Sequence, residues 1–285
     1  MKVVIDEEKA FKKRDIAIYI TIILVCILSI VIAFYVQFYA RIDVGRMLGF
    51  EKETRLGNKT EEQIEQIKAE FDQIFTNEVE STEGQVNKKK EKDKPLIYTK
   101  TQKKESKLNS YDIEVNIPYI NIDNPKIEEY NKEIESFEEK TEDILASENQ
   151  NTIYTVEYIA NVQDDILSLM IRSNLKEGAS AQRVIIETFN YDLRNNKEIS
   201  LEELLKIKGL NKQEVQEKIN NEIKIAQKKV EDLRFLGYNV YNRETSAEKY
   251  QVENAKEIYV TENTLYIIYP YGNETFTSEM DLIII

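Results

Sequence analysis

Residues 152–196 read TIYTVEYIANVQDDILSLMIRSNLKEGASAQRVIIETFNYDLRNN and contain the clearest strand pattern of the chain. It contains three runs rich in β-branched and aromatic residues, at 152–162, 165–175 and 182–193. Gln163-Asp164-Asp165 predicts a tight turn between the first two runs, and Asn195-Asn196 closes the third. Because consecutive strands with short connections pair side by side, the stretch predicts an antiparallel meander.

On the N-terminal side of this meander, a strand and a long helix are expected. Apolar residues alternate with polar ones over 111–117, which is typical of a strand with one buried face. Asn124-Pro125 supplies an N-cap and a proline at the first helical position. The apolar residues that follow have helical spacing, and we expect the helix to end near 147–151.

On the C-terminal side, two further helices and three strands are expected. Ser200 and Glu203 form a capping box for a short helix that stops at Gly209. Asn211 starts a longer helix, and Gly237 suits the residue after its end. The expected strands are 256–260, 264–270 and 280–285. The predicted fold class is therefore α+β, with a mainly antiparallel sheet and two longer helices over residues 96–285.

The N-terminal part has the pattern of a membrane anchor. No charged residue occurs from Ile16 to Val36, and these positions would span about 31 Å as a helix. Lys12-Lys13-Arg14 precede the run, and basic residues accumulate on the cytoplasmic side. We therefore expect a cytoplasmic tail at 1–15, a single transmembrane signal anchor at 16–40 that is not cleaved, and an extracellular C-terminal domain at the cell membrane.

Residues 41–95 are expected to connect the anchor to the domain. Over 59–80 the apolar residues have helical spacing, which predicts a juxtamembrane amphipathic helix that docks on the domain or on a second copy. Residues 88–95, rich in lysine and ending at Pro95, are typical of a charged, solvated linker.

Composition excludes several kinds of chemistry. The chain has no histidine, and its one cysteine, Cys26, lies in the apolar run. Histidine-activated nucleophiles and the usual zinc ligands are therefore missing, and the eight glycines form no phosphate-binding motif. We expect no catalytic residue, no cofactor and no metal. The formal charge is −13, and near −14 beyond residue 15, which disfavours nucleic acid and suits a cationic partner or simple solubility.

A few residues are nevertheless candidates for a site. Acid pairs Asp164–Asp165 and Glu202–Glu203 fit the carboxylate chemistry of a wall glycosidase, but a turn and a helix start explain them more simply. Tyrosine rings stack on sugars, and the chain must turn at 269–272, Tyr-Pro-Tyr-Gly. Tyr154, Tyr158 and Tyr191 are interpreted as strand packing.

Several segments together resemble the C-terminal domain of RsiV-like proteins of Gram-positive bacteria. They are Gly178-Ala179-Ser180, 189–193 (FNYDL), 197–204 (KEISLEEL), 259–263 (YVTEN) and 265–271 (LYIIYPY). Such domains are the extracytoplasmic parts of anti-sigma factors, and similar ones accompany peptidoglycan deacetylases. The family commonly has Gly-Ala-His where this chain has Ser180, so no role of that histidine transfers.

The resemblance implies a non-catalytic binding or sensor module at the cell wall. It suggests peptidoglycan or a lysozyme-like muramidase as the ligand. An anti-sigma-factor-like regulator is the alternative, although a tail of fifteen residues is short for holding a sigma factor. A carboxylate-based wall hydrolase is the third hypothesis.

Overall fold

The computed structural model describes Val25, Leu28, Leu56 and residues 59–81, 89–147, 151–238, 240–271 and 279–285. All elements below belong to one compact unit, Arg55–Ile285. The anchor expected at 16–40 lies outside the described residues, apart from Val25 and Leu28. Within the described part of the chain, no helix has the length and hydropathy to cross a membrane.

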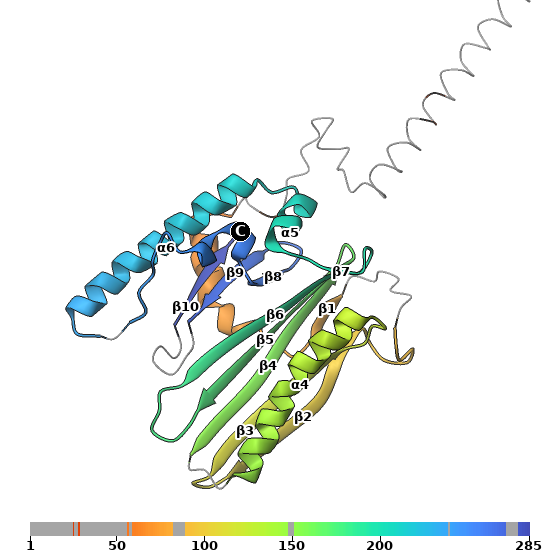
Figure 1. Cartoon of the computed structure of the whole chain (residues 1–285), viewed down its shortest axis with the longest axis vertical. Coiled ribbons are helices and arrows are strands. Elements are labelled where there is room, and N and C mark those ends of the chain that lie inside the picture. The colour runs from red at the N-terminus through yellow and green to blue at the C-terminus, as the bar shows by residue number, and fades with distance from the viewer. Residues whose placement is uncertain are drawn as a thin grey trace, which may run out of the picture. The chain divides into compact units, whose positions relative to one another are not determined.

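A seven-stranded sheet forms the larger part of the unit (Figure 1). Its strand order is β2-β3-β4-β5-β6-β7, and β1 pairs with the C-terminal end of β4. The bounds are β1 Val79–Ser81, β2 Ile97–Lys107, β3 Tyr111–Ile120, β4 Thr152–Gln163, β5 Ile166–Lys176, β6 Arg183–Asp192 and β7 Lys197–Glu198. Strands β4, β5 and β6 pair antiparallel in sequence order, so the meander prediction is confirmed.

The turn between β4 and β5 is a two-residue hairpin loop. Asp164 and Asp165 both have positive φ, at 52° and 63°. Two such residues in a row match the right-handed twist of a hairpin, and aspartate tolerates this conformation better than bulky residues. The register then pairs Gln163 with Ile166 and continues to Ile153 and Lys176.

The sequence analysis missed three strands of this sheet, β1, β2 and β7, and its two parallel pairings, β1 with β4 and β3 with β4. β2 has the sequence IYTKTQKKESK, and all but its first residue are partly or fully exposed, so no apolar alternation marks it. β3 pairs with β4 in parallel, through residues 111–115 and 152–156. A parallel pair needs a long crossover, and α4, Pro125–Ala146, provides it.

Helix α4 covers one face of the large sheet (Figure 1). Asn124 caps it by accepting from the Lys126 N–H, and its C-cap is Ser147, as the sequence predicted. Its buried residues pack with those of β3, β4, β5 and β6 in one apolar cluster. The tyrosines interpreted as strand packing, Tyr154, Tyr158 and Tyr191, are all buried.

A second, three-stranded sheet lies on the other side of the large sheet, with strand order β10-β9-β8. Its strands are β8 Glu257–Val260, β9 Leu265–Pro270 and β10 Met280–Ile284, all antiparallel and all predicted. One face packs against α5, Leu201–Lys208, and α6, Lys212–Phe235. Ile283, Ile284 and Ile285 are buried, so β10 contributes to the apolar clusters on both faces.

The predicted helix over 59–80 is wrong in extent. Helix α3 covers Glu61–Ala69, a 3-10 turn (η1) follows at Phe71–Gln73, and β1 begins at Val79. The apolar face nevertheless docks on the domain, because Ile64, Phe71 and Phe75 are buried in the cluster between the two sheets. Residues 89–95 are exposed as expected, and Asn121 hydrogen-bonds the backbone of Glu91 and Pro95.

Four polar side chains of the large sheet hold the outer edge of β8. Thr188 and Ser168 accept from the N–H groups of Ile258 and Val260, at 3.0 and 3.1 Å. Asn190 and Asn161 donate to the carbonyls of the same two residues, at 2.8 and 2.9 Å. This edge, which would otherwise carry unpaired peptide groups, is thus fully hydrogen-bonded.

We predict that Asn190→Ala lowers the free energy of unfolding by about 2–3 kcal/mol. The substitution leaves the Ile258 carbonyl and the Ser168 hydroxyl without their partner in a buried place. Chemical denaturation measures the change. Asn220→Ala, on the exposed face of α6, is the matched control and should change stability by less than about 0.5 kcal/mol. Equal effects of the two substitutions would contradict the assignment.

Candidate functional site

The structure places the acid pairs considered from the sequence in structural roles. Asp164 and Asp165 form the β4–β5 turn and pair with Lys208 and Arg194. Glu203 completes the capping box with Ser200 at the start of α5, and Glu202 in the first turn pairs with Lys206. Both acid pairs therefore form ion pairs with nearby lysine or arginine side chains, and they stabilise a turn and a helix start.

A different pair of carboxylates, Glu187 and Glu257, was not singled out in the sequence. Burial raises the pKa of Glu187 to about 6, and the charges of Glu257 and Glu133 add to the effect. Burial also raises the pKa of Glu257, although Thr188 donates to it from both its N–H and its hydroxyl. Glu257 thereby accepts a hydrogen bond from the backbone N–H of Thr188 on β6. The three acids share a shallow pocket.

We predict that Glu187→Gln stabilises the protein above pH 6 and has no such effect at pH 4. A carboxyl whose pKa is raised by folding costs stability once it ionises, so the cost is absent below about pH 4.5 and complete above about pH 6. The gain should be about 1–2 kcal/mol at pH 8, since the side chain is partly exposed.

Urea denaturation at pH 4 and pH 8 measures this difference. Glu139→Gln, at an exposed position of α4, is the control and should behave alike at both pH values. A gain for Glu187→Gln that is the same at pH 4 and pH 8 would show that burial of the charge is not its cause.

A larger groove, of about 580 Å³, runs between α6 and β10. Consecutive residues of the β10 region, 279–283, line its floor. Ile225, Val230 and Leu233 of α6 form one wall, and the end of α3 with η1 forms the other. The ion pair between Lys68 and Glu222, at 2.8 Å, bridges the two walls. This groove is the candidate functional site.

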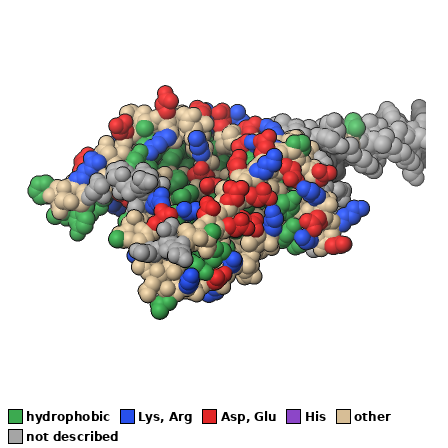
Figure 2. Space-filling view, turned by 60° about the horizontal axis from the view of Figure 1, so that its bottom comes forward, with side chains coloured by type: hydrophobic (Ala, Val, Ile, Leu, Met, Phe, Trp, Pro, Cys, Tyr) green, Lys and Arg blue, Asp and Glu red, His purple; other side chains and the backbone are tan. Residues whose placement is uncertain are grey.

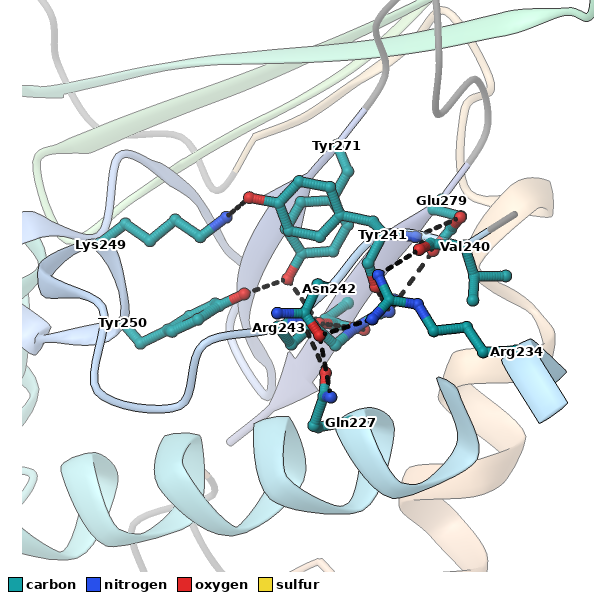
Figure 3. A network of polar contacts seen from close by, with 11 residues as sticks. Gln227, Arg234, Val240, Tyr241, Asn242, Arg243, Lys249, Tyr250, Tyr271 and Glu279 are labelled. Carbon is teal, nitrogen blue, oxygen red and sulfur yellow. Dashed lines mark hydrogen bonds and ion pairs between the residues drawn. The ribbon is translucent and has the colours of Figure 1, made fainter. Parts of the chain in front are cut away.

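A buried ion pair in the lining of the groove joins β10 to the segment after α6. The guanidinium of Arg243 donates from Nε to both carboxylate oxygens of Asp281, at 2.9 and 2.7 Å. Only 7% of the Arg243 side chain and 11% of the Asp281 side chain are exposed. Glu279 accepts from the Tyr241 N–H at 2.9 Å and lies 3.4 Å from Arg243 Nη1 (Figure 3).

Three tyrosines and one lysine continue this network (Figure 3). The Tyr271 hydroxyl donates to Asp281 at 2.5 Å, so Tyr250 donates to Tyr271 at 2.8 Å. The Tyr241 ring stacks on Tyr271 with centroids 4.1 Å apart. Lys249 donates to the Tyr241 hydroxyl at 2.9 Å, and its ammonium lies 4.4 Å from the centre of the Tyr271 ring. The lysine is thus held by aromatic faces.

The segment 240–243 is tied to α6 along one side of the network. Gln227 accepts from the Arg243 N–H at 2.7 Å and donates to Asn242 at 3.1 Å. Arg234 donates to Asn242 and to the Val240 carbonyl, at 3.0 and 3.1 Å. The chain can reverse here because Gly237, with φ of 88°, ends α6 as the sequence predicted. The groove wall and the network therefore form one connected structure.

The electrostatics of the network keep the hydroxyl groups of Tyr250 and Tyr271 protonated. Burial raises the pKa of Tyr271 far above its ordinary value, and the charge of Asp281 adds to it, so this hydroxyl remains protonated. Burial raises the pKa of Tyr250 to about 12. Asp281 is already shared by Arg243 and Tyr271. Among the described residues, no group of three or more acidic or cysteine side chains is arranged to bind a metal ion.

The sequence located part of this site. The Tyr-Pro-Tyr-Gly corner was a candidate, and Tyr271 lies at the centre of the network, while Gly272 lies outside the described residues. Tyr269 is buried and packs edge-on against Tyr250. Arg243 and Asp281 were missed, because they are 38 residues apart and neither belongs to a motif.

We predict that Arg243→Gln lowers the free energy of unfolding by about 3 kcal/mol, because it leaves the Asp281 carboxylate largely buried without its counterion. Thermal or urea unfolding measures the loss. Arg234→Gln is the matched control, since Arg234 is exposed and donates only to neutral acceptors, and it should cost less than about 1 kcal/mol. If both variants unfold alike, the ion pair does not hold β10 in place.

Comparison with known proteins finds similarity only among solved structures. No family model matches the chain, and no curated protein matches it. A DUF3298 family protein from Pseudomonas aeruginosa PAO1 is similar with 12% identity and a TM-score of 0.39, over 67% of this chain and 90% of that one. A DUF3298 member from Bacteroides fragilis NCTC 9343 has 13% identity and a TM-score of 0.35, over 61% and 81%. The RsiV-like resemblance remains a prediction.

Proposed function

We propose that this protein is a membrane-anchored extracytoplasmic binding or sensor module at the cell wall, and that the groove between α6 and β10 is where it binds. The observation that carries the proposal is the groove itself, whose lining is partly apolar and includes the buried Arg243–Asp281 ion pair, to which Tyr271 also bonds. A partly apolar concave surface with a few polar groups is typical of binding sites. The apolar run at 16–36 supports the anchor.

Charge supports a cationic partner. The chain has a formal charge of −13, and Asp and Glu side chains gather across the centre of the face drawn in Figure 2. Opposite charges on two proteins raise their association rate and favour complementary partners, and salt weakens this attraction. A lysozyme-like muramidase, which is strongly basic, fits this surface, and the RsiV-like resemblance of the sequence suggests the same ligand. Peptidoglycan is the other ligand that the resemblance suggests.

We predict that the full-length chain in lipid nanodiscs binds a cationic lysozyme at 50 mM salt, and that raising the salt to 500 mM weakens the affinity about tenfold or more. Biolayer interferometry measures both values. The control is the same lysozyme with its lysines succinylated, which keeps its fold and reverses its charge.

No binding of native lysozyme at 50 mM salt, or equal binding of the succinylated form, would remove this ligand from the proposal. Purified wall fragments, tested in the same way, then decide whether peptidoglycan takes its place. A sigma factor that co-purifies with residues 1–15 would favour the anti-sigma alternative instead.

A further inference from the structure

The two edges of the small sheet are treated differently by the rest of the protein. At the β8 edge, the outward N–H and C=O groups of Ile258 and Val260 all bond to side chains of the large sheet. At the opposite edge, β10 pairs with β9 alone among the described strands. Among the described residues, hydrogen bonds therefore close the β8 edge of this sheet and leave the β10 edge open.

The hydrogen bonds to β9 show which peptide groups of β10 point outward. Ile285 and Leu265 exchange both backbone bonds, at 2.9 and 3.2 Å, and the Tyr271 N–H donates to Glu279 at 2.9 Å. Bonded and non-bonded pairs alternate in an antiparallel ladder. The N–H and C=O groups of Met280 and Leu282 therefore face away from β9. Both residues are partly exposed, and no described residue bonds to these outward groups.

This open edge lies on the floor of the groove. Ile225 and Leu233 of α6 stand beside it with 45% and 40% of their surface exposed, although both are large and apolar. Phe71 lines the opposite wall. An extended peptide can add to an exposed sheet edge as a further strand, if the edge has unpaired peptide groups and pockets beside it. The peptide groups provide main-chain hydrogen bonds, which give affinity, and the pockets select the side chains of alternate residues. The free edge of β10 and the apolar walls of the groove provide both.

We infer that the groove binds an extended peptide segment of a partner protein, which adds as a further strand to the free edge of β10. The segment pairs with the peptide groups of Met280 and Leu282. It carries apolar side chains at every second residue, which pack on Ile225 and Leu233. It is basic overall. The inference rests on the groove being the binding site of the proposed function, and it adds the mode of binding.

The shape of the groove favours a single strand over a second copy of this chain. The edge of β10 is recessed between α6 and the α3–η1 segment, and these are joined by the Lys68–Glu222 ion pair. A second copy would bring the same two walls with its own edge, so the two recessed edges are kept apart. A lone extended segment has no walls and fits.

The expected charge of the segment follows from the lining and from the whole chain. Four carboxylates line the groove, from Asp72, Glu222, Glu279 and Asp281, against three cations, from Lys68, Lys229 and Arg243. The groove is thus slightly acidic within a chain of formal charge −13. Lysine or arginine at the residues between the apolar ones satisfies this field.

The test uses a labelled probe peptide, Thr-Val-Lys-Val-Thr-Val-Lys, and the full-length chain in lipid nanodiscs. Fluorescence anisotropy gives the dissociation constant. The probe is also made with every second amide N-methylated, in the two alternating patterns. Because only one edge of the added strand faces β10, one pattern should weaken binding at least tenfold and the other should leave it within twofold.

Variants of the protein test the groove itself. Leu233→Asp places a charge on the apolar wall, and we expect at least tenfold weaker binding of the probe. Phe235→Asp is the matched control, since Phe235 is on the same helix, is 92% exposed and does not line the groove; it should leave binding within twofold. Met280→Pro removes one outward donor and keeps the β9 ladder, so it should weaken binding with little change in melting temperature.

Equal binding of both N-methylated probes, or equal effects of Leu233→Asp and Phe235→Asp, would overturn the inference. So would self-association of the chain that Leu233→Asp abolishes while the probe fails to bind, because the occupant would then be a second copy. Failure of the proposed ligand is separable, since the probe can bind as expected while lysozyme and wall fragments do not.

Discussion

Four hydrogen bonds to the edge of β8 fix the register of the small sheet on the large one. Asn161, Ser168, Thr188 and Asn190 project from three adjacent strands of the large sheet and together satisfy two residues of β8. Each such bond contributes only about 1 kcal/mol net, but an unsatisfied buried peptide group costs about 1–3 kcal/mol. A shifted β8 would leave several of these groups unpaired, so the four hydrogen bonds fix the position of β8. Because β8 pairs with β9 and β9 pairs with β10, they also fix the position of β10.

The geometry of the candidate site depends on these four hydrogen bonds. β10 forms the floor of the groove, and α6 packs on the same small sheet through Val215, Ile219 and Ile223. The segment that follows α6 then returns along the helix and brings Arg243 to Asp281. No part of the groove depends on the acid pairs at Asp164–Asp165 or Glu202–Glu203, which lie in other turns. The site is thus a product of packing between elements far apart in the chain.

The sequence predicted the parts of the fold that depend on near neighbours. The Asp164-Asp165 turn, the Asn124-Pro125 helix start and the Ser200 capping box each need residues within a few positions, and all are present. Of the site, Tyr271 was found because the chain must turn beside Pro270. The bonds across the two sheets could not be predicted in the same way, because polar residues on a strand, such as Asn190, do not show which distant peptide group they meet.

Two misses have distinct physical causes. β2 lacks an apolar face because it is an edge strand whose side chains are mostly exposed, so burial leaves no periodic pattern in its sequence. The helix at 59–80 was drawn too long because Phe71, Ile74 and Phe75 keep helical spacing while the backbone passes into a 3-10 turn. These residues bury the same face in either conformation, and periodicity alone cannot distinguish the two.

The Arg243–Asp281 pair also bears on why β10 keeps a single register. Side chains of a strand alternate between its faces, so a slip by one residue would exchange the two faces of β10. Asp281 would then enter the apolar cluster that holds Ile284, and Leu282 would meet the guanidinium of Arg243. Buried ion pairs contribute little net stability, but breaking one is costly, which makes such a pair effective at excluding the wrong register. The same pairing therefore determines that Met280 and Leu282, and not their neighbours, present their peptide groups to the groove.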